Sequence, residues 1–580
     1  MSLSGDIRSI LAADIGSAWT KVVLIDWVEG QFRLVARAQA PTTLGGSGAD
    51  GIMSGLRAAI AQIERTIGRQ LLRGENLLMP EAGPAIGVDA FAATTSAAEN
   101  LAVVIAGLCR DTSVRAAQAA ASATYCDVRA VVSANGGVEA GSDRRWFALG
   151  TGDTAGDLED LAVCDADAVL LVGGYDGGAV GPVRDLATAV ASAGLTRIRD
   201  RSVVFAGNVA ARATVTELLA GETDLRVVDN VAPRPGVMSP EPTARELGTL
   251  YRERKLKQLA GYHGLISWSV SDVLPSADCF WLTLRFLAQE YRSRLLGVDV
   301  GSANTVLGVA YGDTLERTIR TRMGTGSGCR GLLASVGSQR VARWLKDALT
   351  EEEILAFAQA REDQPFVISA SDRQIALEAA FAREAMRAVT GPRQVDMVLG
   401  SGGSLARSLT MDQAALALLD GVQPVGVVEL ALDPGQLAAV IGAVASRQPD
   451  AAAQVVLGDS VVHLGLAVCP TGQARPGHVA LRARLRLPDG VVAEREVTVG
   501  SIARMAAPPG ARAQLEIRPS RGFSVGLGSG VPAVMELVCS GLGVLIDCRG
   551  RPFEPPADAS ERAVVLQQWS RAMASDGEPI

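Results

Sequence analysis

The chain has 580 residues and a formal net charge of −8 at pH 7, which excludes the basic surface of a typical nucleic-acid-binding protein and allows roughly two to four domains. No segment reaches the roughly 18 consecutive apolar residues of a membrane span, and the N-terminus lacks a signal-peptide pattern, so we expect a cytoplasmic protein. The eight cysteines include no Cys-x-x-Cys pair and the three histidines are far apart, which argues against structural zinc and iron–sulfur clusters.

Near the N-terminus, two apolar runs at 10–13 and 22–25 flank the polar segment Asp-Ile-Gly-Ser-Ala-Trp-Thr-Lys at 14–21. Two β-rich runs joined by such a turn predict a hairpin. The turn has the residue types of a phosphate site: an acid that can hold Mg²⁺ through water, a glycine that lets backbone amides approach an anion, hydroxyls and a lysine. The candidate binding residues here are Asp14, Gly16, Ser17, Thr20 and Lys21.

The same pattern recurs much later in the chain, at 295–309, around Asp-Val-Gly-Ser-Ala-Asn-Thr. Each copy is followed by a further alternating segment, at 32–37 and at 315–320. Two copies of one β-meander predict a duplicated fold in which each copy opens a lobe. The second set of candidate residues is Asp299, Gly301, Ser302 and Thr305, and we expect the backbones of Gly16, Ser17, Gly301 and Ser302 to supply hydrogen-bond donors.

Between the two hairpins, a helix is predicted at 53–69, and apolar strands then alternate with helices. The expected strands are 101–106, 128–133, 168–172, 202–205 and 226–228. Continuous apolar strands between helices predict a parallel sheet that is covered on both faces. Helices are expected to follow over 243–289.

Three of these strands end in turns that carry glycine with Asp or Asn. In parallel sheets, ligands bind outside the carboxyl ends of the strands. We therefore expect a rim that faces a ligand or a partner protein, made of Gly174, Asp176, Asn208 and Asn230. The alternative is that the glycines only permit tight strand-to-helix turns.

After the second hairpin come a glycine-rich loop at 323–331, a long helix at 372–389 and a strand at 395–399 that runs into Gly-Ser-Gly-Gly-Ser. A strand, a glycine turn and a helix let a purine ring or a phosphate lie against the backbone. This turn adds Gly400, Gly402 and Gly403 to the candidate set. Beyond residue 455, short alternating runs at 479–487 and 491–499 flank Pro-Asp-Gly and predict a β-hairpin.

The order of two Asp-x-Gly-Ser hairpins and a later Gly-Ser-Gly-Gly resembles the actin, Hsp70 and sugar-kinase superfamily, whose two lobes clamp ATP with Mg²⁺. The segments at 173–178, 206–208 and 230–233 resemble the MutL family named for glutamate mutase, which is unrelated to the mismatch-repair protein. The resemblance covers roughly residues 8 to 450. It implies an ATP-binding accessory or chaperone-like protein that serves an adenosylcobalamin-dependent mutase, with ATP and Mg²⁺ as cofactors and Asp14 and Asp299 as the metal-orienting acids.

The resemblance also implies an α/β fold: a duplicated actin-like (ribonuclease H-like) ATPase core with an inserted parallel-sheet region and a C-terminal β-rich domain. The expected ranges are 1–90 for the start of lobe I, 91–290 for its α/β extension, 291–452 for lobe II, 455–556 for the β-rich domain, and 557–580 for a short helix and tail. The β-rich domain is expected to dock a partner or to mediate self-association.

The chain departs from the family pattern in both phosphate turns. Ala18 replaces a hydroxyl, and Ala303 and Val306 stand where the family has threonines and an acid. The small-residue motif at 95–98 loses its glycines to Glu99 and Asn100, and the loop at 324–328 lacks an acid. These losses predict slow hydrolysis with retained binding.

Two alternatives stay open: an actin-like scaffold of the FtsA or PilM type, and a small-molecule kinase. The absence of a terminal amphipathic helix lowers the first. An iron–sulfur activator ATPase is disfavoured because the chain lacks suitable paired cysteines.

Overall fold

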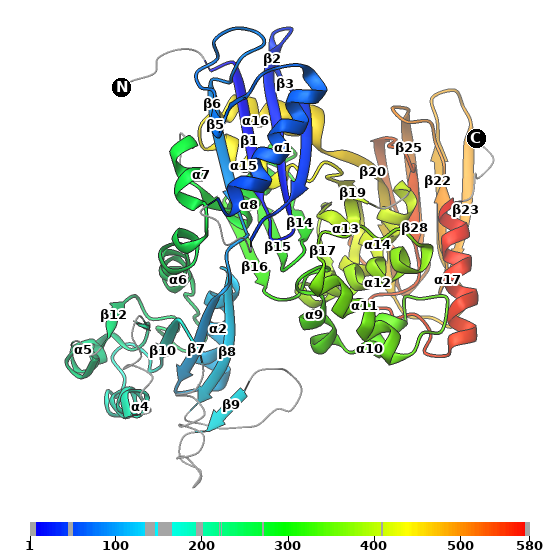
Figure 1. Ribbon diagram of the computed structural model, residues 1–580. Coiled ribbons are helices and arrows are strands. Elements are labelled where there is room, and N and C mark those ends of the chain that lie inside the picture. The colour runs from blue at the N-terminus through cyan, green and yellow to red at the C-terminus, as the bar shows by residue number, and fades with distance from the viewer. Residues whose placement is uncertain are drawn as a thin grey trace. The chain divides into compact units, whose positions relative to one another are not determined.

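The computed structural model (Figure 1) describes residues 7–44, 50–133, 145–148, 165–192, 201–219, 221, 223–269, 272–407 and 410–574. The tail expected after the last helix, 575–580, lies outside these residues. The chain forms two compact units. We call Met1–Ala97 together with Gly264–Ile580 the core unit, and Ala98–His263 the inserted unit. Among the residues described, no helix has the length and apolar character needed to cross a membrane.

The core unit begins with a five-stranded sheet in the order β13-β6-β1-β2-β3. Its strands are β1 (Ser9–Ile15), β2 (Trp19–Val28), β3 (Gln31–Pro41), β6 (Ala90–Thr95) and β13 (Leu274–Pro275). β2 pairs antiparallel with both β1 and β3, whereas β6 pairs parallel with both β1 and β13. Helix α1 (Ile52–Ile67) packs on this sheet and ends at Gly68. The φ of 70° at Gly68 lies in the left-handed region, which favours glycine because it has no Cβ. The short strands β4 (Leu72–Arg73) and β5 (Asn76–Leu77) form a separate hairpin.

A second sheet repeats this arrangement as β16-β15-β14-β18-β19. Its strands are β14 (Leu295–Val300), β15 (Thr305–Tyr311), β16 (Thr314–Arg320), β18 (Met397–Ser401) and β19 (Pro424–Leu432), with β17 (Arg393–Gln394) beside β19. The pairing directions match those of the first sheet, strand for strand. The equal order and directions of the two sheets confirm the duplicated, actin-like α/β core.

Two helices pack on the sheet that they do not follow in the chain. Helix α8 (Ser276–Glu290), which follows the first sheet, packs against β14 and β15 of the second. Helix α15 (Ala438–Ala445), which follows the second sheet, packs against β1 and β6, and α16 (Pro449–Val455) packs on β3. Figure 1 shows these yellow helices beside the blue strands. The residues expected to form lobe II, 291–452, therefore serve both sheets.

Glycines make room for these helices. Gly297 and Gly308 lie opposite each other in the second sheet. A Cβ would lie 2.3 Å from the Leu284 side chain of α8 at Gly297, and 2.7 Å from it at Gly308. A Cβ on Gly442 of α15 would lie 1.9 Å from the carbonyl oxygen of Cys279. The backbones of α8 and α15 are therefore in direct contact where the two helices cross.

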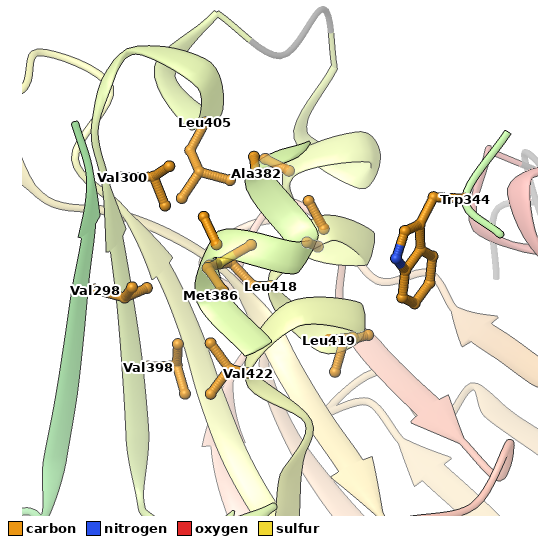
Figure 2. Packing of buried hydrophobic residues seen from close by; sticks show 14 of the residues in the cluster. Val298, Val300, Trp344, Ala382, Met386, Val398, Leu405, Leu418, Leu419 and Val422 are labelled. Carbon is orange, nitrogen blue, oxygen red and sulfur yellow. The ribbon is translucent and has the colours of Figure 1, made fainter. Parts of the chain in front are cut away.

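The remaining core helices cover the second sheet. They are α9 (Cys329–Val336), α10 (Ser338–Ala342), α11 (Glu351–Asp363), α12 (Asp372–Val389), α13 (Gly403–Ala406) and α14 (Met411–Val422). Helix α12 begins at a capping box formed by Ser371 and Gln374. Figure 2 shows Met386 and Leu418 facing the strands, with Trp344 on the far side of the helices.

The C-terminal β-rich region is only partly separate. Three of its strands, β20 (Val462–Cys469), β28 (Val544–Asp547) and β24 (Ile502–Met505), extend the second sheet from β19. The others form a sheet in the order β23-β22-β25-β27 and a small pair, β21 with β26. Their bounds are β21 (Thr471–Gly472), β22 (Val479–Arg486), β23 (Val492–Thr498), β25 (Arg512–Pro519), β26 (Phe523–Ser524) and β27 (Ala533–Val538). β22 and β23 form the predicted hairpin, and helix α17 (Ala559–Ala574) follows.

The inserted unit contains the predicted parallel sheet, in the order β12-β11-β10-β7-β8-β9. Its strands are β7 (Leu101–Gly107), β8 (Cys126–Ser133), β9 (Arg145–Ala148), β10 (Ala168–Val172), β11 (Ser202–Phe205) and β12 (Asp224–Val227). Its helices are α2 (Arg115–Ser122), α4 (Gly181–Ser192), α5 (Arg212–Leu219) and α6 (Glu241–Arg254), and α7 (Tyr262–Trp268) leads into the core unit. The strand order reverses between β7 and β10, as in doubly wound sheets.

Candidate functional site

The two hairpin turns are closed by their own backbones. The amide of Gly16 donates to the carbonyl oxygen of Trp19 at 3.0 Å, and the amide of Gly301 donates to that of Asn304 at 3.0 Å. A Cβ on Gly16 would lie 3.0 Å from the same Trp19 oxygen, and one on Gly301 would lie 2.8 Å from that of Asn304. Both turns are therefore tight enough to leave little room for a Cβ. The two glycine amides, which were expected to supply hydrogen-bond donors, each have a backbone acceptor within their own turn.

Asp14 and Lys21 lie side by side on the first hairpin. The buried Asp14 carboxylate accepts a hydrogen bond from Ser276 Oγ at 2.8 Å, and its Oδ2 lies 3.4 Å from Lys21 Nζ. About a fifth of the Lys21 side chain stays exposed, at 21%. Lys21 is therefore paired with Asp14 and is only partly enclosed.

The two threonines of the candidate set have supporting contacts. The hydroxyl of Thr20 lies 2.9 Å from that of Thr42, which follows β3. The hydroxyl of Thr305 donates to the carbonyl oxygen of Met323 at 2.6 Å. These contacts hold the strands next to each turn.

Asp299, on the second hairpin, has a perturbed carboxyl group. Burial raises its pKa to about 6, Lys21 opposes the rise, and the carboxylates of Asp14 and Asp433 add to it. The candidate acids of the two hairpins are thus close enough to interact. The structure brings Asp14, Lys21 and Asp299 into one electrostatic cluster.

Asp433 is a member of this cluster that the sequence analysis missed. It directly follows β19 and is fully buried, and burial raises its pKa. Its carboxylate accepts the amides of Leu437 and Ala438 at 2.9 and 2.8 Å, which caps the start of α15, and the Ser401 hydroxyl at 3.1 Å. An apolar strand that ends in Asp-Pro-Gly was the available signal.

The glycine-rich loop at 324–328 packs on the second hairpin turn. The amides of Gly326 and Gly328 both donate to the carbonyl oxygen of Ser302 at 2.9 Å, and the amide of Ser327 donates to Ser302 Oγ at 3.1 Å. A Cβ on Gly326 would lie 2.2 Å from that hydroxyl oxygen. Glycine is thus needed for the close approach, and the loop holds the turn in place.

The glycine turn after β18 lies against the same hairpin. Gly402 has a φ of 101°, and a Cβ there would lie 2.2 Å from the carbonyl oxygen of Val300. The Ser404 hydroxyl lies 2.7 Å from that of Thr325 and donates to Glu378 at 3.0 Å. Gly400 and Gly403 pack against Leu418 and Arg407, with Cβ positions 2.8 and 2.7 Å from those side chains. The three glycine-containing segments therefore meet at one place.

A cavity of about 720 Å³ opens beside this turn. Ser404, Arg407 and Glu378 line it together, and Glu378 accepts hydrogen bonds from both of the others. Burial alone would raise the pKa of Glu378, but Arg407 and Arg361 outweigh it and hold the pKa below its ordinary value. The apolar part of the lining includes Trp344, Leu349, Ile368, Leu416, Leu566 and Trp569. The cavity therefore combines apolar surface with polar and charged side chains, as small-molecule sites do.

In the inserted unit, the four predicted rim residues lie together at the carboxyl ends of β10, β11 and β12. Asn230 Nδ2 donates to the carbonyl oxygen of Gly174 and to Asp176 Oδ1, both at 2.9 Å. Asp176 also accepts the amide of Val209 at 3.0 Å, and Asn208 donates to the carbonyl oxygen of Gly178 at 3.0 Å. These polar groups hold the three turns to one another.

Among the residues that the structure describes, no three His, Cys, Asp or Glu side chains are grouped to hold an ion. The described cysteines are free thiols, and most are buried. Cys164 lies outside the described residues.

Several solved structures are distantly similar. The nucleotide-free acetone carboxylase structure is 11% identical, with a TM-score of 0.32 and coverage of 85% of this chain and 81% of that one. The activator of 2-hydroxyisocaproyl-CoA dehydratase from Clostridium difficile with bound ADPNP is 10% identical (TM-score 0.27; 76% and 95% covered). Xylulose kinase from Bifidobacterium adolescentis is 12% identical (0.26; 80% and 96%). A likeness this distant is no evidence of activity or ligand.

No curated protein matches the chain. The family model described as MutL protein matches residues 10–459, which is most of the chain and includes both hairpins, the inserted unit and the glycine turn. This chain therefore belongs to the MutL protein family.

Proposed function

We propose that the protein binds ATP with Mg²⁺ in its core unit, with the phosphates at the two hairpin turns and the adenosine end at the glycine turn. The observation that carries this is the convergence of Asp14, Lys21 and Asp299 from two hairpins that are far apart in sequence. Two carboxylates can hold the cation through its waters, and an ammonium can bind the phosphate oxygens, so the three groups together fit a metal-bound polyphosphate.

Each residue has a separate role in this proposal. Asp14 and Asp299 accept hydrogen bonds from the waters of the cation, and Lys21 binds a phosphate oxygen as a point charge. The backbones of Ser17 and Ser302 supply donors. Asp433 acts as a positioning residue, because it joins Ser401 before the glycine turn to the start of α15. The cation supplies charge neutralisation when it is bound.

Isothermal titration with MgATP tests the site. Asp14→Ala and Asp299→Ala should abolish the heat seen with wild type, whereas Asp313→Ala, an exposed acid in the β15–β16 turn, should bind like wild type. Absence of heat with the wild-type protein would overturn the nucleotide proposal.

The cavity is proposed to take the base. Ser404 of its lining is linked to the second hairpin through Thr325, whose amide donates to the carbonyl oxygen of Gly301 at 3.0 Å. Arg407→Ala should weaken ATP more than inorganic triphosphate, because only ATP has a group for the cavity. Equal losses for both ligands would place the base elsewhere.

Hydrolysis is proposed to be slow, because Ala18, Ala303 and Val306 carry no hydroxyl or acid to orient a water. The expected turnover of the isolated protein is far below the roughly 10 s⁻¹ that is common for dedicated enzymes. Turnover near that rate without a partner would contradict this part.

We also propose an accessory role for an adenosylcobalamin-dependent mutase, which rests on the family resemblance. Because Asp176, Asn208 and Asn230 hold the turns together, the neighbouring exposed side chains of Tyr175 and Val209, 36% and 45% exposed, are better contact candidates. Pull-down from native lysate with Tyr175→Ser plus Val209→Ser should lose the partner. Leu218→Ser, exposed elsewhere in the inserted unit, is the control. Retention of the partner by the double variant would exclude this rim.

A further inference from the structure

Helix α17 supplies one wall of the cavity beside the glycine turn. Leu566, Trp569 and Ser570 of α17 line it, with Ser404 and Arg407 also in its lining. A ligand in this space therefore meets side chains from the C-terminal end of the described chain. Nothing in the sequence pattern of the short final helix indicated this.

The same helix also holds a second wall. Arg562 Nε of α17 donates to the carbonyl oxygen of Leu345 at 3.2 Å, and Leu345 lines the cavity together with Trp344 and Lys346. Displacement of α17 would remove the side chains that it contributes to the lining and would break this hydrogen bond to Leu345.

Helix α17 is attached by one face. Of its sixteen residues, Arg562, Trp569 and Met573 are buried, and Val565, Leu566 and Ala572 are partly buried against the same hydrophobic cluster. The Trp569 indole donates to the carbonyl oxygen of Gly500 at 3.1 Å and lies 4.7 Å from the Arg549 guanidinium. A helix that packs by one face only has a lower free energy of local opening than the interior strands, so a ligand that contacts it can shift its docking equilibrium.

We infer that docking of α17 is coupled to occupancy of the cavity, so that α17 is a ligand-sensing wall of the nucleotide site. This inference rests on the proposed nucleotide function and adds its regulation. Binding of the base stabilises the docked helix, and the docked helix in turn raises affinity by the same factor, because such coupling is reciprocal. The C-terminal strands receive the effect through Arg504 of β24, which donates to the carbonyl oxygen of Met573 at 3.3 Å.

The first measurement is hydrogen exchange of residues 559–574 with no ligand, with MgATP and with magnesium triphosphate. MgATP should slow exchange in α17 by about 5-fold or more, and triphosphate, which has no base, should leave it unchanged. Unchanged exchange with saturating MgATP would overturn the inference.

The second measurement is affinity. Trp569→Ala and Leu566→Ala should each weaken MgATP binding by about 5- to 50-fold and leave triphosphate binding as in wild type. Val564→Ala, on the exposed side of α17 at 55% exposure, is the matched control and should bind like wild type. Leu566→Ala serves if Trp569→Ala unfolds, because Leu566 is outside the Arg549 contact.

The two failures are distinguishable. If wild type binds no MgATP, the proposed function fails. If wild type binds MgATP while Leu566→Ala binds equally well and exchange in α17 does not change, only the coupling fails.

Discussion

At the scale of single residues, Asp299 shows how a candidate binding group costs stability. Burial raises the pKa of its carboxyl group from 3.8 to about 6, and the nearby carboxylates of Asp14 and Asp433 contribute to the rise. The ionised carboxylate is unfavourable in the free protein, and a bound cation would offset that repulsion. The acid that marks the site in the sequence therefore lowers the stability of the unliganded fold.

Asp299→Asn should stabilise the free protein. Because the folded-state pKa lies above the unfolded value, stability falls as pH rises from about 4 to about 6, and above that range the full penalty is present. The amide removes the charge, so we expect a gain of about 1–2 kcal/mol at pH 7.5, little gain at pH 4, and loss of MgATP binding. Urea unfolding at both pH values measures the change in the free energy of unfolding, with Asp313→Asn as the control. A loss of stability at pH 7.5 would contradict the assignment.

At the scale of elements, a buried ion cluster joins the C-terminal strands to the helices of the second sheet. Arg549 donates to both carboxylate oxygens of Asp547 at 2.8 Å and to Asp420 of α14 at 2.7 Å. Arg383 of α12 donates to the other oxygen of Asp420 at 2.7 Å. Burial would raise the pKa of Asp547, but Arg549 and Arg551 outweigh it and hold the pKa well below its usual range.

Arg549→Ala should destabilise the core unit by about 3–5 kcal/mol, because it leaves two buried carboxylates without their main partner. The control is Arg482→Ala, which removes an exposed pair with Glu496 and should cost under about 1 kcal/mol. Chemical denaturation of both variants gives the comparison. Equal small effects would show that the cluster is replaceable.

The crossing of α8 and α15 is a second element-scale feature. Gly442→Val places side-chain atoms where the carbonyl oxygen of Cys279 already lies, so the two helices must separate. We expect a loss of about 1–3 kcal/mol or more in the free energy of unfolding. Gly391→Val, where a Cβ meets nothing within 4 Å, is the steric control. A Gly442→Val protein as stable as the control would mean that the crossing adjusts freely.

At the scale of the whole molecule, the C-terminal strands are part of the second lobe. β20 lies between β19 and β28, and Leu464 and Leu545 belong to the same buried cluster as Val298. A chain that ends at residue 455 should therefore fail to fold its second lobe, whereas a chain that ends at Ala574 should melt like the full protein. Circular dichroism melts test this. A cooperative, wild-type-like transition of the shorter chain would show that the C-terminal strands form a domain independent of the second lobe.

The sequence by itself determined the local and repeated features. Two copies of Asp-x-Gly-Ser between apolar runs predicted the two hairpins and the duplication, and continuous apolar strands predicted the parallel sheet of the inserted unit, because strand periodicity and turn chemistry are properties of neighbouring residues. Tertiary structure alone decided which sheet each crossing helix covers, that Asp433 joins Asp299, and that Trp569 lines a cavity beside Ser404. These are contacts between residues far apart in the chain, where packing and backbone approach, rather than local propensity, choose the partner.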